Sequence, residues 1–388
     1  MMIKNIFLLG STGSIGQSTV DVVRQHPDHF RIGALVTNRN TGLLSQQIDL
    51  LKPERVIIYN RDAYQAFSSD SRWKGVQILC GKEGILEALA ANKYDLFLNA
   101  FVGFAGLEPT VFAIKEGIDI AIANKETLVV AGSLINELAG KARIRLLPID
   151  SEHSAIWQCL AGEDKTSVRK LIITASGGPF RRKSKSELGH VTPQEALQHP
   201  NWNMGDKITI DSATMMNKGL EIIEAFWLYD LPLDKIEVLV HPQSVIHSMV
   251  EFWDRSVKAQ LGLPDMRIPI QYALSYPERL DLDVPEADFT KIGRLDFEPP
   301  DPERFPCLRL AFEAISSGNT YPAALNAANE AAVEAFLKNM IKFTDIPVIV
   351  EEILRMHKPL TAGTLENFIT VDAQTRKEAG HLIKLKQI

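Results

Sequence analysis

The chain has 388 residues, of which 45% are apolar and 23% charged, and its formal net charge at pH 7 is −6. This length and composition fit a globular protein of two or three domains, and the mildly acidic balance argues against general binding to nucleic acids or membrane surfaces. No apolar run reaches the ~20 residues of a membrane span. The N-terminal apolar stretch is too short for a signal peptide, and three widely separated cysteines point to a reducing compartment, so we expect a cytoplasmic enzyme.

Short apolar runs alternate with segments of helical spacing over the first 150 residues. Strands are predicted at residues 3–9, 31–36, 55–58, 77–80, 95–99, 118–123 and 145–149. Helices are predicted at residues 16–24, 43–51, 84–91, 107–115 and 128–138. Strands that alternate with helices in this way predict a doubly wound parallel sheet of the α/β class.

A glycine-rich turn directly follows the first predicted strand, with Gly10, Gly13 and Gly16 in the sequence GSTGSIG. Glycines at a strand-to-helix turn let the backbone approach a pyrophosphate, which the helix N-terminus then attracts. The spacing is GxxGxxG rather than GxGxxG, so an ordinary glycine-rich turn is the alternative. The position after the first strand favours dinucleotide binding.

The end of the second predicted strand indicates which dinucleotide is bound. NAD sites usually place Asp or Glu there to bind the ribose 2′-hydroxyl, whereas this chain has Thr37, Asn38, Arg39 and Asn40. Arg39 can pair with a 2′-phosphate, which favours NADP. A solvated loop arginine is the alternative.

Two further predicted strands end in polar residues. The sixth is followed by Asn124, Lys125 and Glu126, and the seventh by DSEH at residues 150–153. Open α/β sheets bind ligands at the carboxyl ends of their strands, and hard cations such as Mg²⁺ and Mn²⁺ prefer carboxylate oxygens. The alternatives are a surface turn for the first segment and an ordinary acidic helix start for the second.

The middle of the chain combines a strand, a turn of small residues and a long irregular segment. Residues 168–174 predict a buried strand, and Ser176 follows it with two glycines, which can form either a concavity for an anion or a plain turn. Residues 180–206 are rich in Arg, Lys, His and Pro, and long irregular segments of enzymes are often lids. Three large side chains on this segment fit a lid or a hydrophobic anchor: His199, Trp202 and Met204.

A polar helix face is predicted within residues 211–221, DSATMMNKGLE. If the helix already includes Asn217, then Asn217, Lys218 and Glu221 share one face through i+3 and i+4 spacing. Such a face can bind a phosphate through Asn217 and Lys218 and a metal ion through Glu221. An exposed Lys–Glu pair is the alternative, although the apolar residues that follow leave these polar groups in need of partners.

The last part of the chain predicts an α+β region followed by helices. Strands at 237–241, 248–253 and 257–261 favour an antiparallel sheet, in which His241 and His247 are interpreted as structural residues. The proline-rich residues 276–306 predict a linker. Helices are predicted beyond it at residues 308–316, 323–338, 346–356 and 373–385.

Seven motifs occur in a fixed order along the chain: GSTGSIG, ANKE, LLPIDSEH, SGGPFR, HPNWNMG, DSATMMNKGLE and HPQSVIHSM. They are joined by PDMR at 264–267 and ALNAANE at 324–330. This combination resembles the 1-deoxy-D-xylulose 5-phosphate reductoisomerase family, and its order over two domains makes the resemblance highly specific. The resemblance, and not the composition, implies the substrate.

The resemblance also implies sites for NADPH, a divalent cation and a small phosphorylated sugar. The implied NADPH site consists of Thr12, Gly13, Ser14, Ile15, Asn38, Arg39, Asn40, Asn124, Glu126, Met204 and Gly205. The implied metal ligands are Asp150, Glu152 and Glu221. The implied substrate contacts are Lys125, Ser151, Glu152, Ser176, His199, Trp202, Ser212, Asn217, Lys218 and Glu221. Candidates for catalytic groups are Lys125, Glu152, His153 and His199.

The family reaction implied for the chain has two halves, in the methylerythritol phosphate pathway of isoprenoid precursor biosynthesis. Deoxyxylulose phosphate rearranges to 2-C-methylerythrose 4-phosphate, and NADPH reduces this aldehyde to 2-C-methyl-D-erythritol 4-phosphate. Magnesium, manganese and cobalt all fit carboxylate ligands. The family likeness further implies a homodimer. Within each chain we expect an NADPH-binding domain at residues 1–149, a catalytic domain at 150–276 whose lid is about 180–206, a linker at 277–306 and a small helical domain at 307–388.

Two other functions fit parts of this pattern. Another two-domain NADP-dependent dehydrogenase, of the homoserine or semialdehyde type, would need no divalent cation and would lack the face formed by Asn217, Lys218 and Glu221. A non-catalytic NADP-binding sensor would bind the cofactor without turnover, and it would leave the clustered polar residues unexplained.

Overall fold

The computed structural model describes residues 3–69, 71–73, 75–91, 93–202 and 204–387. The chain forms two compact units. The first comprises Met1–Asn124, Ile135–Ser154 and Asp265–Val284, and the second comprises Lys125–Leu134, Ala155–Pro264 and Pro285–Ile388. Two helices, α6 (Lys125–Ala142) and α7 (Ser151–Leu160), contribute residues to both units. The domain boundaries expected from the sequence stay a prediction.

The first unit is built on a parallel sheet. Its strands are β1 (Lys4–Leu9), β2 (Phe30–Thr37), β3 (Arg55–Ile58), β4 (Gln77–Cys80), β5 (Leu96–Asn99), β6 (Asp119–Ile122) and β7 (Leu146–Pro148). In the described residues the order is β4-β3-β2-β1-β5-β6-β7, and every neighbouring pair is parallel. The strands are apolar along almost their whole length because helices cover both faces of such a sheet, and this confirms the doubly wound α/β prediction.

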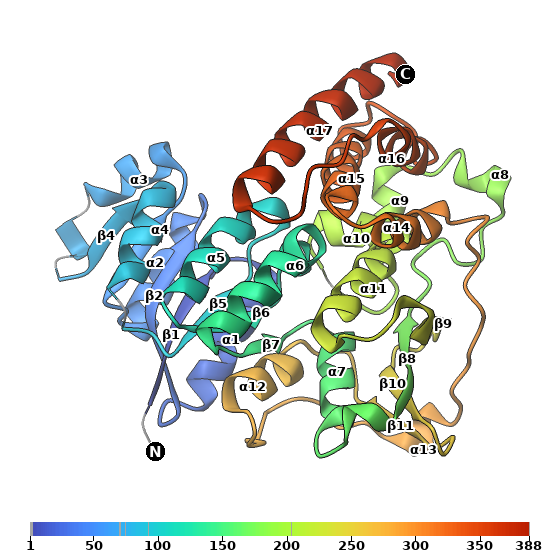
Figure 1. The fold of residues 1–388 in the computed structure, drawn as a ribbon. Coiled ribbons are helices and arrows are strands. Elements are labelled where there is room, and N and C mark those ends of the chain that lie inside the picture. The colour runs from blue at the N-terminus through green and yellow to red at the C-terminus, as the bar shows by residue number, and fades with distance from the viewer. Residues whose placement is uncertain (1–2, 70, 74, 92, 203, 388) are drawn as a thin grey trace. The chain divides into compact units, whose positions relative to one another are not determined.

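The helices of the first unit follow the strands in alternation (Figure 1). They are α1 (Ser14–Gln25), α2 (Thr41–Leu51), α3 (Arg61–Ser68), α4 (Gly81–Ala90) and α5 (Leu107–Lys115), with short 3-10 helices η1 (Ser71–Trp73) and η2 (Gly103–Gly106). A later helix, α12 (Arg267–Ser275), also belongs to this unit. The sequence did not predict α3, in which Phe67 is the buried residue. It also did not predict α12, which packs on α1 through an ion pair of 2.9 Å between Arg267 and Asp21.

The second unit contains a mixed sheet. Its strands are β8 (Val168–Ala175), β9 (Ile236–Val240), β10 (Ile246–Phe252) and β11 (Val257–Leu261), in the order β11-β10-β8-β9. β10 is antiparallel to both of its neighbours, as predicted. The antiparallel expectation is wrong for β9, which pairs with β8 in parallel. The long helical connection between β8 and β9 returns the chain to the same end of the sheet, as a parallel pair requires.

Helices make up most of the second unit (Figure 1). They are α8 (Lys185–Leu188), α9 (Pro193–Ala196), α10 (Asp206–Ala213), α11 (Met216–Tyr229), α13 (Phe289–Ile292), α14 (Pro306–Ser317), α15 (Tyr321–Leu337), α16 (Asp345–Met356) and α17 (Leu365–Lys386), with 3-10 helices η3 (Lys165–Ser167) and η4 (Leu233–Lys235). The C-terminal helices α14 to α17 confirm the predicted helical region, in which the alanine-rich α15 packs against α16 and α17. None of the helices in the described part of the chain combines the length and apolar character that a membrane crossing requires.

Candidate functional site

The glycine-rich turn lies at the point where the strand order of the first unit reverses. β1 pairs with β2 on one side and with β5 on the other, and this switch point is where doubly wound sheets bind dinucleotides. Gly10 has φ +93°, and a Cβ on it would lie 2.6 Å from the carbonyl oxygen of Ala100. A Cβ on Gly16 would lie 2.2 Å from the carbonyl oxygen of Gly10. Both glycines are therefore required by the turn itself.

The turn leaves the start of α1 open to a ligand. Gly13 caps α1 without a side-chain hydrogen bond, and both Gly13 and Ser14 are exposed. The Thr12 hydroxyl lies 2.6 Å from that of Thr37 at the end of β2, while Ile15 is half-buried. A helix N-terminus without a side-chain cap presents backbone N–H groups and a partial positive charge, which fits a pyrophosphate.

The loop after β2 carries an exposed cation. Asn38, Arg39 and Asn40 are all exposed. Within the described residues the Arg39 guanidinium forms no hydrogen bond or ion pair, so it is available to a phosphate. The Asn40 side chain accepts a hydrogen bond of 3.1 Å from the Leu43 N–H and thereby caps α2. Asn40 therefore has a structural role in addition to the cofactor contact predicted for it.

Asn124 is buried and not part of a surface turn. Its side-chain amide donates hydrogen bonds of 2.9 Å to the carbonyl oxygens of Phe101 and Gly103. Asn99, at the end of β5, donates in turn to the carbonyl oxygen of Gly106 at 3.1 Å. These asparagines fix the loop that follows β5 beside the glycine-rich turn, whose Gly10 lies against Ala100.

Asp150 and Glu152 lie where β7 gives way to α7, as the sequence predicts. One oxygen of each carboxylate lies within 4.8 Å of the other, and the Ser151 hydroxyl donates to Glu152. His153 is fully buried, with its Nδ1 3.4 Å from Oδ1 of Asp150. Two carboxylates that converge at the end of a strand fit a hard divalent cation, and His153 is placed to orient Asp150.

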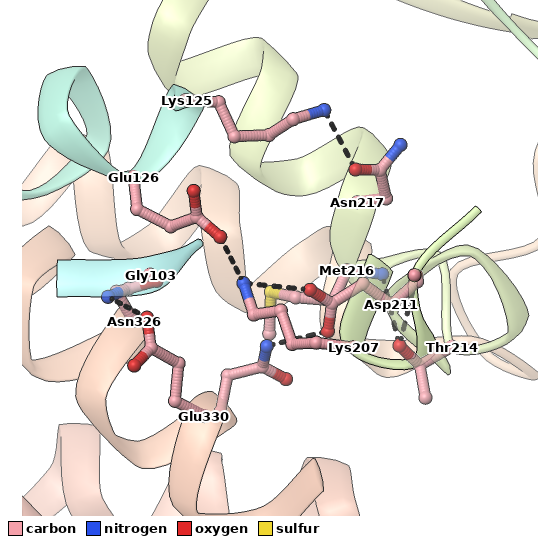
Figure 2. A network of polar contacts seen from close by, with 12 residues as sticks. Gly103, Lys125, Glu126, Lys207, Asp211, Thr214, Met216, Asn217, Asn326 and Glu330 are labelled. Carbon is pink, nitrogen blue, oxygen red and sulfur yellow. Dashed lines mark hydrogen bonds and ion pairs between the residues drawn. The ribbon is translucent and has the colours of Figure 1, made fainter. Parts of the chain in front are cut away.

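The second unit brings Lys125, Asn217, Lys218 and Glu221 together. The Lys125 ammonium donates to Oδ1 of Asn217 at 2.8 Å and to Oε1 of Glu221 at 3.2 Å (Figure 2). Asn217 also donates to Oε1 of Glu221 at 2.6 Å, and Lys218 forms an ion pair with the other oxygen of this carboxylate. This confirms that α11 includes Asn217 and that Asn217, Lys218 and Glu221 share one face.

This cluster is buried. The side chains of Lys125 and Glu221 are 6% and 1% exposed, and Lys218 is also buried. Two buried ammonium groups therefore face one carboxylate, whereas an exposed Lys–Glu pair would be solvated. Buried charges are stable only when they are paired or hydrogen-bonded, and buried ammonium groups of this kind can also bind the charged oxygens of a phosphate ester.

Ser176 begins a turn that fits closely against α10. Gly177 and Gly178 have φ values of +81° and +68°, and the N–H of Gly178 donates to the Ser176 hydroxyl at 3.2 Å. A Cβ on Gly178 would lie 2.6 Å from the carbonyl oxygen of Ser212. The turn and Ser212 are therefore in direct contact.

His199 reaches the same turn, and its hydrogen bonds define its tautomer. Its Nδ1 accepts hydrogen bonds from the backbone N–H groups of Asn201 at 3.2 Å and Trp202 at 3.0 Å. A neutral imidazole that accepts at Nδ1 carries its proton on Nε2, and Nε2 lies 2.9 Å from the Ser176 hydroxyl. His199 is therefore a hydrogen-bond donor toward the turn.

Replacement of His199 tests whether it donates a hydrogen bond or transfers a proton as a general base. We expect His199→Gln, whose amide can donate near the position of Nε2, to retain kcat/KM within about tenfold, and His199→Asn to lose about 100-fold because the donor is lost. The pH profile of kcat/KM should keep its shape in the Gln variant. Equal losses in both variants, with one limb of the profile missing, would assign proton transfer to His199.

Other predicted residues lie on the same unit. The Trp202 ring lies 6.1 Å from the ring of His247, Gly205 caps α10, and Met204 precedes it. His241 is fully buried and accepts from the Val245 N–H at 3.2 Å, which confirms it as structural. The sequence analysis missed Lys207, which pairs with Glu126; its i+4 spacing from Asp211 was the available signal.

Comparison with protein families identifies three matches. Residues 6–132 match 1-deoxy-D-xylulose 5-phosphate reductoisomerase, residues 146–229 match its C-terminal domain model, and residues 261–378 match the DXP reductoisomerase C-terminal domain. A 1-deoxy-D-xylulose 5-phosphate reductoisomerase from Chlorobaculum tepidum is 53% identical over 386 residues, covering 98% of the chain and 100% of the relative. One from Prosthecochloris aestuarii is 54% identical, covering 98% and 99%.

Comparison with solved structures identifies the same family. A DOX-P reductoisomerase in complex with NADPH, fosmidomycin and magnesium is 43% identical with a TM-score of 0.95, covering 99% of both chains. The 1-deoxy-D-xylulose 5-phosphate reductoisomerase of Zymomonas mobilis in complex with NADPH is 46% identical with a TM-score of 0.92, covering 98% of this chain and 99% of that one. The similarity therefore extends over the whole chain in both sequence and fold.

Proposed function

The chain belongs to the 1-deoxy-D-xylulose 5-phosphate reductoisomerase family, and from this premise we propose that it converts 1-deoxy-D-xylulose 5-phosphate to 2-C-methyl-D-erythritol 4-phosphate. The observation that supports this most directly is the buried cluster of Lys125, Asn217, Lys218 and Glu221, which offers two cations and a carboxylate to a phosphorylated, metal-chelating substrate. A dehydrogenase of another family and a non-catalytic sensor are not favoured, because identity near 53% extends over 98% of the chain.

The cofactor is held by the first unit. The open N-terminus of α1 would bind the pyrophosphate of NADPH through the backbone of Thr12, Gly13 and Ser14. Arg39 would pair with the 2′-phosphate. The loop at Asn38 differs from the Gly-Lys-Asn that is frequent in the family, but the positive charge is retained.

Reversal of the charge at residue 39 should change the cofactor preference. We expect Arg39→Glu to weaken NADPH binding by about 100-fold, because a charge-assisted pair is replaced by repulsion, and to leave NADH binding nearly unchanged. Titration of both cofactors measures this, with Arg24→Glu, at an exposed arginine of α1, as the control. If both cofactors are weakened equally, Arg39 does not contact the 2′-phosphate.

Asp150, Glu152 and Glu221 are proposed as ligands of one divalent cation. All three offer carboxylate oxygens, and the first two converge at the end of β7. When bound, such a cation polarises a carbonyl as a Lewis acid, while NADPH supplies the hydride. His153 would hold Asp150 in orientation from behind.

The substrate would be fixed by its phosphate. Ser176, Ser212, Asn217 and Lys218 would hold the phosphate, and His199, whose Nε2 lies 2.9 Å from the Ser176 hydroxyl, would donate to it. Lys125 would orient the substrate hydroxyls, and Ser151 and Glu152 are proposed as further substrate contacts. Trp202, Met204 and Gly205 lie on the segment that would exclude water from the aldehyde. Lys125 and Glu152 stay the candidates for proton transfer.

The function is tested by following the oxidation of NADPH with deoxyxylulose phosphate as the substrate. We expect turnover that a chelator abolishes and that added Mg²⁺, Mn²⁺ or Co²⁺ restores. NADPH binding without turnover at any of these ions would instead favour the sensor. Turnover that is insensitive to the chelator would favour a dehydrogenase of another type.

We further propose that the protein is a homodimer located in the cytoplasm. The domain boundaries expected from the sequence are part of the same proposal. β11 is an edge strand of the described sheet, with Val257 and Leu261 exposed. Such an edge offers unpaired backbone groups and apolar side chains to a second copy. Sedimentation of the intact protein should give twice the mass of the chain, and a monomer would contradict the proposal.

A further inference from the structure

A buried ion cluster is centred on Lys207 and includes Glu126, one of the residues implied for the NADPH site. The ammonium of Lys207, on the first turn of α10, lies 2.5 Å from Oε1 of Glu126 and 3.0 Å from Oδ2 of Asp211 (Figure 2). The three side chains are 15%, 9% and 1% exposed, respectively. One cation thus joins two carboxylates from different helices away from solvent.

The cluster continues into the C-terminal helices. Asn329 of α15 donates to Oδ1 of Asp211 at 2.7 Å. The next residue, Glu330, accepts from Asn326 at 3.0 Å and pairs with Arg376 of α17 at 2.5 Å. The carboxylate of Asp211 therefore has partners on both sides, and α10 is tied to α15 by a hydrogen bond that involves no proposed ligand residue.

The elements joined by Lys207 are the ones that present proposed site residues. Glu126 is the second residue of α6, and the first is Lys125, whose ammonium reaches Asn217. Ser212 directly follows Asp211 on α10. A shift of the first turn of α6 relative to α10 would therefore move Lys125 and Ser212 apart.

We propose that Lys207 is a positioning residue of the reaction, an inference that rests on the proposed function. Its ammonium fixes the first turn of α6 against α10, and this sets where Lys125 and Ser212 meet the substrate. Lys207 itself need not touch the substrate, because its ammonium is already paired with both Glu126 and Asp211.

The charges of the cluster are mutually dependent. Burial alone would lower the pKa of Lys207, but the carboxylates of Asp211 and Glu126 raise it above its ordinary value. Burial would likewise raise the pKa of Glu126, but the neighbouring ammonium of Lys207 lowers it. Both groups are therefore ionised at neutral pH, and removal of the cation leaves two buried carboxylates without the positive charge that they share.

The test compares Lys207→Met with Lys207→Arg, at a temperature well below the unfolding midpoint of each variant. We expect Lys207→Met to lower kcat about 100-fold, the cost of a misplacement of about 1 Å, with KM for deoxyxylulose phosphate changed less than threefold because Ser176, Asn217 and Lys218 are retained. Lys207→Arg should restore kcat to within about tenfold, since it returns the charge.

Lys170 provides the matched control. It also lies between two carboxylates, 2.6 Å from Glu237 and 3.4 Å from Glu251, but on β8 and away from any proposed ligand. Lys170→Met should lower the unfolding midpoint and leave kcat unchanged. A folded Lys207→Met with kcat within threefold of the unaltered protein, or an equal loss of kcat in Lys170→Met, would overturn the proposal.

A second variant covers the case in which Lys207→Met does not fold. Lys207→Gln combined with Glu126→Gln replaces the ion pair by a neutral pair that can still form a hydrogen bond, and here too kcat should fall while KM changes little. An unaltered kcat in the double variant would overturn the proposal. If the unaltered protein has no reductoisomerase activity, both the proposed function and the proposed role of Lys207 are wrong. If the unaltered protein is active and the double variant is equally active, only the proposed role of Lys207 is wrong.

Discussion

Asp150→Asn should lower turnover by at least about 1,000-fold at a saturating concentration of NADPH, because a lost ligand removes several kcal/mol of stabilisation by the cation. The affinity for NADPH should stay within about twofold, since the glycine-rich turn and Arg39 follow β1 and β2, whereas Asp150 follows β7. Steady-state kinetics and a cofactor titration measure the two effects. Asp119→Asn is the matched control, because Asp119 pairs with Arg145 at 2.6 Å and has no proposed ligand role.

A double variant then asks whether Asp150 and Glu221 bind the same cation. If they do, the losses of turnover caused by Asp150→Asn and Glu221→Gln should not be additive, and the double variant should be no slower than the slower single variant. Fully additive losses would mean that the two carboxylates act independently. Near-normal activity of Asp150→Asn would remove the metal assignment altogether.

Lys218→Met should strongly reduce the preference for a phosphorylated substrate. The ammonium is buried beside Glu221, and loss of a charge-assisted hydrogen bond of about 3 kcal/mol to a phosphate corresponds to about 100-fold in kcat/KM. The expected change is in KM, since the contact is made equally in the ground state and the transition state.

Deoxyxylulose without its phosphate provides the control for this variant. The unaltered protein should use it far less efficiently than the phosphorylated sugar, and Lys218→Met should use the two with much more similar kcat/KM values. If the ratio between the two substrates is unchanged, Lys218 does not bind the phosphate. Glu221 retains its contact with Lys125 at 3.2 Å, so the fold should tolerate the substitution.

The parallel sheet was predictable because its strands are buried on both faces. Continuous apolar runs such as those of β1 and β2, followed by glycine or polar residues, leave few alternatives. α10 was not predicted, because its sequence DKITIDSA has isoleucine and threonine in a pattern that also fits a strand. The helical outcome depends on contacts with α11 and α15, which no local pattern contains.

The site was predictable where its residues are close in sequence. Asn217 and Glu221 lie one turn apart, so their hydrogen bond follows from helix geometry alone. The pairing of Lys207 with Glu126 joins residues 81 positions apart, and only the fold brings them together. The tautomer of His199 depends on the backbone conformation at Asn201 and Trp202, which the sequence does not specify.

The contact between Gly178 and the carbonyl oxygen of Ser212 has a consequence for inhibitors. Backbone lies against backbone here, so the pocket proposed for the phosphate cannot be enlarged by rotating a side chain. A competitive compound must therefore present a compact tetrahedral anion, and a bulkier acidic head group would have to separate the turn after β8 from α10. Substitution at Gly178 offers no simple route to resistance, because any side chain there would clash with the backbone of α10 at Ser212.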